Sequence, residues 1–132
     1  MSTASTLTSG AVYVALGGLW FTPLFGKQWD RAVGFERPPR WRPGLPYYAM
    51  PLAGCLAVAA AVDFLLGQVA AHSLREALTL GLVLGAGISL AITTVNALAP
   101  NMPRPALYAA VTGSYHQLGA VLCAAIHFWM RG

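Results

Sequence analysis

The sequence predicts an all-α membrane protein built as a four-helix transmembrane bundle. Hydrophobic residues occupy 57% of the 132 positions, and charged residues occupy only 9%. Soluble domains carry about 25% charged residues, so a surface made from this chain is too apolar for water. The mean hydropathy of +0.60 agrees with this interpretation. The length suits one compact membrane domain without a separate soluble one.

Four apolar runs divide the chain into predicted spans. A helix needs about 20 mostly apolar residues to cross the hydrocarbon core of a bilayer. The runs that meet this requirement are Ser5–Phe25, Tyr47–Ala70, Glu76–Leu98 and Ala106–Met130. The first run lacks a preceding basic segment and a small-residue cleavage site, so we interpret it as a retained helix rather than a signal peptide. Pro23 should bend or end this helix in its last turn.

The loop between the first two spans is basic. It begins with residues 25–35, whose helical spacing of apolar and charged positions predicts a short interfacial helix, and it continues in a Pro-rich stretch without regular structure. Together with the loop before the fourth span it holds six basic residues: Lys27, Arg31, Arg37, Arg40, Arg42 and Arg104. The opposite side holds Arg75 and Arg131. This bias predicts that both termini lie outside the cytoplasm.

The third span carries small residues at every fourth position: Gly81, Gly85, Ser89 and Thr93. Such a stripe lets another helix approach closely, either within the chain or in a second copy of it. A homo-oligomer is therefore one alternative for the assembly. Cys55 and Cys123 lie in apolar runs without metal-binding spacing and are expected to act as small buried hydrophobic residues.

The fourth span carries polar residues that are costly in a bilayer. Thr112, His116, Cys123 and His127 share one face, and about 16 Å separates the two histidines along the helix. His127 lies near the outer boundary, where interfacial solvation is expected. His116 is deeper, with Tyr115 beside it, and is either a structural imidazole bonded to a neighbour or a functional group.

Asp63 is the other ionisable residue inside a span. Its depth differs from that of His116 by about 10 Å, too far for a direct pair, whereas Tyr13 lies nearer and is a candidate donor to it. The alternative is an acid that reaches out to the interface. Three further residues are expected to close the cytoplasmic end of a shared cavity: Trp20, Thr22 and Asn96.

The segment GGLWFTPLFGKQWDRAVGF, Gly17–Phe35, resembles the opening signature of the domain-of-unknown-function 1761 family of small membrane proteins. The second half, from Leu84 to Trp129, is similar to the family more loosely. The resemblance implies a bacterial-type membrane protein with four helices. It implies no catalytic residues.

The residues favour a site in the bundle interior that binds or converts a small lipophilic molecule by isomerisation, cyclisation or oxidation. His116 is the candidate proton carrier, Tyr115 or Tyr13 the polarising group, and Asp63 the orienting acid. Thr112, Cys123 and His127 would line the substrate site. No cofactor, metal or nucleic acid is expected, and membrane lipids are expected neighbours. The alternatives are an oligomeric transporter or pore, and a structural or accessory protein.

Overall fold

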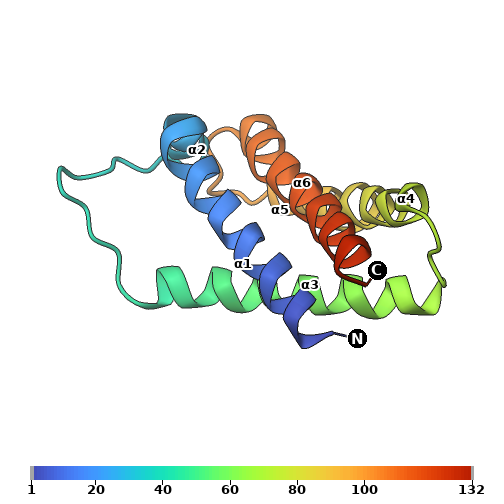
Figure 1. The fold of residues 1–132 in the computed structure, drawn as a ribbon. Helices are drawn as coiled ribbons and strands as arrows, with labels where there is room; N and C mark the ends of the chain where they lie inside the picture. Colours follow the sequence, from blue (N-terminus) through green and yellow to red (C-terminus); the bar gives the residue numbers. More distant parts are fainter. Residues whose placement is uncertain (1, 132) are drawn as a thin grey trace.

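The computed structural model describes residues 2–131 and consists of helices joined by loops (Figure 1). Four segments are long and apolar enough to cross a membrane: Thr3–Leu24, Pro46–Gln68, Leu74–Asn96 and Pro105–Arg131. No β-strand occurs within residues 2–131. The predicted all-α fold with four apolar spans is therefore confirmed.

The first span changes its helical geometry at Pro23. Helix α1 (Thr3–Leu19) continues into a π-helical turn, Trp20–Leu24. Proline has no backbone N–H and breaks the regular hydrogen-bond ladder, and here the N–H of Phe25 donates to the carbonyl of Trp20, five residues back, at 2.7 Å. Helix α2 (Gly26–Val33) follows at once, in the segment where a short amphipathic helix was predicted.

The second and third spans begin with strong helix-start signals. Helix α3 (Pro46–Gln68) has proline in its first turn, where the missing N–H costs nothing. Helix α4 (Leu74–Leu84) begins with a capping box in which Ser73 accepts from the N–H of Glu76 at 3.2 Å and the Glu76 carboxylate accepts from the N–H of Ser73 at 3.1 Å. A π-helical segment, Gly85–Leu90, joins α4 to α5 (Ala91–Asn96).

Helix α6 (Pro105–Arg131) is the centre of the bundle. It packs against α1, α3, α4 and α5. Half of its most apolar window is buried, against 17–28% for the other three spans. Figure 1 shows α1 and α6 crossing α3 on one side and α4 lying beyond α6, with the two chain ends at the same end of the bundle. Side chains on α6 therefore reach most of the other helices.

The outward faces of the four spans are apolar. Large hydrophobic side chains are exposed on each of them, including Leu7, Leu19, Leu52, Phe64, Val83, Ile92 and Trp129. Soluble proteins rarely expose so much contiguous apolar surface, whereas lipid chains solvate it well. The chain is a membrane protein.

The small-residue stripe of the third span packs against α6 of the same chain. A Cβ atom on Gly81 would lie 2.9 Å from the Cα atom of Val121, and one on Gly85 would lie 3.0 Å from the Cα atom of Gln117. Thr93 is also buried, and Ser89 is partly buried. The stripe could contact a helix of the same chain or of a second copy, and the structure shows the contact within the chain.

We predict that Gly119→Ala destabilises the bundle, because a methyl group at position 119 would overlap the ring of Tyr13. The free energy of unfolding should fall by about 1–3 kcal/mol, as for other overpacked cores. Gly54→Ala on α3 is the matched control, since a Cβ atom there meets nothing within 4 Å. Thermal unfolding in detergent, followed by circular dichroism, compares the two variants. Equal melting temperatures would contradict the packing described for Gly119.

Candidate functional site

The polar residues expected to share one cavity form two separate groups. Tyr13 and His116 lie together near the middle of the bundle, and we call them the Tyr13–His116 pair. Asp63 lies with His127, Ser9, Arg131 and the backbone of Ser2, and we call these residues the Asp63 cluster. The expected contact between Tyr13 and Asp63 is wrong, because the Tyr13 hydroxyl bonds to His116 instead.

The Tyr13–His116 pair joins α1 to α6. The hydroxyl oxygen of Tyr13 and Nδ1 of His116 are 2.6 Å apart, a short hydrogen bond. Tyr115, the neighbour of His116, donates its hydroxyl to the backbone carbonyl of Tyr13 at 3.2 Å. The Tyr115 hydroxyl is also 3.5 Å from the sulfur of Cys55 on α3. Three helices thus hold the two tyrosines in place.

Glycines make room for the two tyrosine rings. Tyr13 is 1% exposed and packs over Gly119. A Cβ atom on Gly17 would lie only 2.8 Å from the hydroxyl oxygen of Tyr115. The centroids of the two rings are 5.1 Å apart, and Phe21 lies against Tyr115 at 4.9 Å. The rings therefore fill the space between α1 and α6 at this depth.

The second nitrogen of His116, Nε2, is not completely enclosed by the bundle. The residue is only partly buried, and Nε2 has no hydrogen-bond partner within residues 2–131. This nitrogen is not fully buried, so it is reachable from the surface. Thr112, one turn earlier on the same face of α6, has a buried hydroxyl without a partner in that same part of the chain. Two hydrogen-bonding groups near this site are therefore unused.

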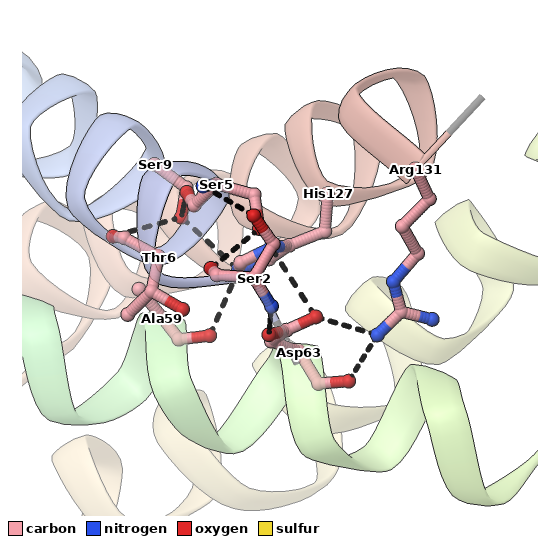
Figure 2. Close-up of polar contacts among 8 residues, drawn as sticks. All are labelled: Ser2, Ser5, Thr6, Ser9, Ala59, Asp63, His127 and Arg131. Carbon is pink, nitrogen blue, oxygen red and sulfur yellow. Dashed lines mark hydrogen bonds and ion pairs between the residues drawn. The ribbon is translucent and has the colours of Figure 1, made fainter.

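Asp63 is completely buried and held by two donors (Figure 2). The guanidinium group of Arg131 lies 2.5 Å from Oδ1, and it also bonds to the backbone carbonyl of Asp63. The N–H of Ser2 donates to Oδ2 at 3.0 Å. Burial of a carboxylate requires such partners. The alternative of an acid that reaches out to the interface is wrong, because α1 and the end of α6 cover it.

His127 is also completely buried, so the interfacial solvation expected for it is wrong. Its Nε2 is 2.9 Å from the carbonyl oxygen of Ala59 on α3 and 3.1 Å from the hydroxyl of Ser9 on α1. Its Nδ1 is 3.6 Å from Oδ1 of Asp63. The residue lies near the end of α6, but the first turns of α1 and the last turns of α3 pack over it (Figure 2).

Ser9, His127 and Asp63 have the residue types of a hydrolase triad but not its hydrogen bonds. The Ser9 hydroxyl donates to the carbonyl of Ser5 at 2.7 Å, and the Ala59 carbonyl can only accept. Nε2 of His127 therefore carries a proton and cannot take one from Ser9. Ser9 is fully buried as well, so no substrate reaches it.

The remaining predicted residues lie elsewhere or have local partners. Trp20 donates its indole N–H to the carbonyl of Val111 at 2.9 Å, which ties the end of α1 to α6. Thr22 bonds to the carbonyl of Gly18 in its own helix and is exposed, as is Asn96. Cys123 is buried, with its sulfur 3.9 Å from the carbonyl of Ser9. In residues 2–131, no group of three or more His, Cys, Asp and Glu side chains could hold a metal ion.

Two surface hollows lie away from both groups. One, of about 580 Å³, lies at the start of α4 around Glu76 and Leu80. The other, of about 350 Å³, lies between α2 and the Pro-rich loop and is lined by Trp29, Phe35 and Trp41 among others. Neither includes a residue of the Tyr13–His116 pair or the Asp63 cluster.

Sequence reasoning missed the serines of α1 and the role of Arg131. Ser5, Ser9 and Tyr13 are spaced by four residues and so share one face, a signal for a polar stripe turned toward the bundle. Both serines are fully buried. Arg131 gave no such signal, because a basic residue at a helix end is equally expected to contact water or lipid headgroups.

We predict that Asp63→Ala lowers the free energy of unfolding by about 3 kcal/mol or more, because Arg131 and the N–H of Ser2 lose their buried acceptor. Asp30→Ala is the control. Asp30 pairs with Arg37 at 2.8 Å in a more exposed position, where such pairs contribute about 0–1 kcal/mol. Chemical unfolding in mixed micelles measures both. A similar cost for the two substitutions would contradict the role given to the Asp63 cluster.

The family model "Protein of unknown function (DUF1761)" matches residues 5–128. No curated protein and no solved structure matches the chain. The matched region includes the Tyr13–His116 pair as well as Ser9, Asp63 and His127, and it extends over nearly all of the four spans. The resemblance carried by Gly17–Phe35 is confirmed. The chain belongs to the DUF1761 family.

Proposed function

We propose that the Tyr13–His116 pair binds the polar group of a small lipophilic molecule that arrives from the membrane. One observation carries the proposal: Nδ1 of His116 is held by Tyr13 at 2.6 Å, while Nε2 is free of partners among residues 2–131 and reachable from the outside. An imidazole inside a span is costly, and this one leaves half of its hydrogen-bonding capacity unused. A ligand with a carbonyl or hydroxyl group would use it.

The pair can serve either as donor or as acceptor. When the Tyr13 hydroxyl donates to Nδ1, the neutral imidazole carries its proton on Nε2 and donates to a ligand carbonyl. When Nδ1 carries the proton and donates to Tyr13, Nε2 accepts from a ligand hydroxyl. With its proton on Nδ1, the neutral imidazole can take a proton from one ligand atom at Nε2 and return it to another ligand atom, which supports isomerisation without a redox partner. We therefore extend the proposal to proton exchange with the bound molecule.

The surroundings favour a rigid site. Tyr115 bonds to the backbone of Tyr13, Cys55 on α3 contacts the hydroxyl of Tyr115, and glycines set the depth of both rings. The hydroxyl of Thr112, one turn from His116, is also without a partner among residues 2–131, but it is buried. Because the rings fill the interior, the ligand lies against the lipid-facing side of the bundle. Lipid solubility of the ligand follows from that position.

The transporter alternative has less support. That alternative requires an oligomer, and the stripe of small residues on the third span was the expected contact between copies. Gly81 and Gly85 of this stripe pack against α6 within the chain. The other alternative is a purely structural role for the Tyr13–His116 pair. The two roles differ in one respect, since a structural pair has no need of a reachable Nε2.

We predict that His116→Phe lowers photolabelling of the protein by a long-chain ketone that carries a diazirine beside its carbonyl. In liposomes the loss should be about fivefold, the equivalent of one hydrogen bond of about 1 kcal/mol. Tyr13→Phe should lower labelling as well, because Nδ1 loses its partner. Mass spectrometry of the labelled peptides reads out the result.

Two controls make this experiment specific. His72→Phe changes an exposed histidine in the loop before α4 and should leave labelling unchanged. A hydrocarbon diazirine of the same length should label all variants equally, because it has no polar group. If the ketone labels His116→Phe as strongly as His72→Phe, His116 does not bind the ligand.

We also propose that the protein lies in a bacterial inner membrane with the basic loop on the cytoplasmic side. Six of the eight basic residues support this orientation. Single-cysteine variants test it with a membrane-impermeant maleimide. His72→Cys should react in intact cells, and Arg40→Cys only after lysis; both positions are exposed, whereas Cys55 and Cys123 are buried. The reverse pattern would mean the opposite orientation.

A further inference from the structure

We propose that Asp63 and His127 form a proton-binding site, separate from the Tyr13–His116 pair. The observation behind it is a buried nitrogen: Nδ1 of His127 has no hydrogen-bond partner in the described part of the chain, although the residue is fully buried. It is directed at Oδ1 of Asp63, 3.6 Å away (Figure 2). Buried polar atoms without a partner are rare in folded proteins.

The other nitrogen of His127 already carries a proton. Its two neighbours are the carbonyl oxygen of Ala59 at 2.9 Å and the hydroxyl oxygen of Ser9 at 3.1 Å. A carbonyl only accepts, and the single Ser9 proton is directed to the carbonyl of Ser5. Both neighbours are therefore acceptors, and Nε2 is the donor between them.

With its proton on Nε2, a neutral His127 would turn the lone pair of Nδ1 toward a carboxylate. Asp63 accepts from Arg131 at Oδ1 and from Ser2 at Oδ2, so its oxygens act as acceptors. Two acceptors that face each other in an apolar interior leave Nδ1 without a donor and place its lone pair against a negatively charged oxygen. A second proton on the imidazole turns this contact into a charge-assisted donor–acceptor pair. A small shift then closes the gap to hydrogen-bond length.

Of the charges around the site, the carboxylate of Asp63 favours this proton and the guanidinium of Arg131 opposes it. Asp63 faces His127 from α3, and Arg131 contacts the same carboxylate from the last turn of α6. Helix α1 contributes Ser5 and Ser9, which carry no charge, and α6 adds the thiol of Cys123 one turn away. The Arg131 side chain is 30% exposed, so its charge is partly solvated at the rim, whereas His127 is enclosed.

The proton would join three helices at one end of the bundle. Ser2 and Ser9 belong to the start of the first span, Asp63 and Ala59 to α3, and His127 to α6. Arg131 and Ser2 are the partly exposed residues of the Asp63 cluster, so a proton would enter the site beside them. A proton that binds or leaves here changes the contact between α6 and α3 directly, whereas the Tyr13–His116 pair lies several turns away along α6.

Nitrogen-15 NMR of the histidine-labelled full chain in lipid bilayers at pH 7 tests the site. The protein has three histidines, so the resonances are assigned with His72→Gln and His116→Gln. We expect both ring nitrogens of His127 to carry protons in the wild-type protein. Asp63→Asn should remove the proton from Nδ1 and leave the one on Nε2. The His116 resonances should not respond to Asp63→Asn.

Two results would overturn the proposal: an unprotonated Nδ1 of His127 in the wild-type protein, or a proton on Nδ1 that persists in folded Asp63→Asn. Folding of the variant is checked by circular dichroism. Because Asp63→Asn is expected to be less stable, a second measurement uses the wild-type protein alone. A dipolar contact between the Nδ1 proton and the carboxyl carbon of Asp63 is expected there, and its absence would exclude the shared site. Photolabelling at His116 is independent of either result.

Discussion

The structure depends on satisfying polar groups inside an apolar bundle. Lipid offers no hydrogen-bond partners, so each buried donor and acceptor must find one in the protein. Helix α6 concentrates this requirement, because it carries both His116 and His127 and contacts most of the other spans. The first helix supplies the matching groups from Ser9 and Tyr13, and α3 supplies Asp63 and the carbonyl of Ala59. The association of α1, α3 and α6 is thus specified by polar contacts as well as by packing.

Close packing makes these contacts reachable. Without a hydrophobic driving force between helices in lipid, association relies on van der Waals contact over small residues. Gly119 and Gly17 admit the tyrosine rings on one side of α6, and Gly81 and Gly85 bring α4 against its other side. The same approach of backbones that stabilises the bundle places the Tyr13 hydroxyl at hydrogen-bond distance from His116. Packing and site geometry therefore share the same glycines.

The two polar groups of α6 differ in their access to the outside. The Tyr13–His116 pair leaves one imidazole nitrogen reachable, which suits recognition of a molecule dissolved in the membrane. The Asp63 cluster encloses its imidazole and leaves Arg131 and Ser2 partly exposed, which suits a species as small as a proton. One helix thus carries two chemically different polar groups, proposed as two sites, at two depths. Histidine serves both because its two nitrogens can be engaged independently.

Local composition determined the four spans, the change of helical geometry at Pro23 and the small-residue face of the third span, because length, apolar content and missing donors act within a few turns. It also identified His116, Asp63 and Tyr13 as costly residues in need of partners. Only the tertiary structure decided which partners they take. From its depth along the second span, Asp63 was predicted to lie near Tyr13. The way α1 and α3 pack on α6 instead brings Asp63 to His127 and Arg131. The burial of His127 was likewise hidden, because it arises from neighbouring helices that cover the end of α6 and not from its own position in the chain.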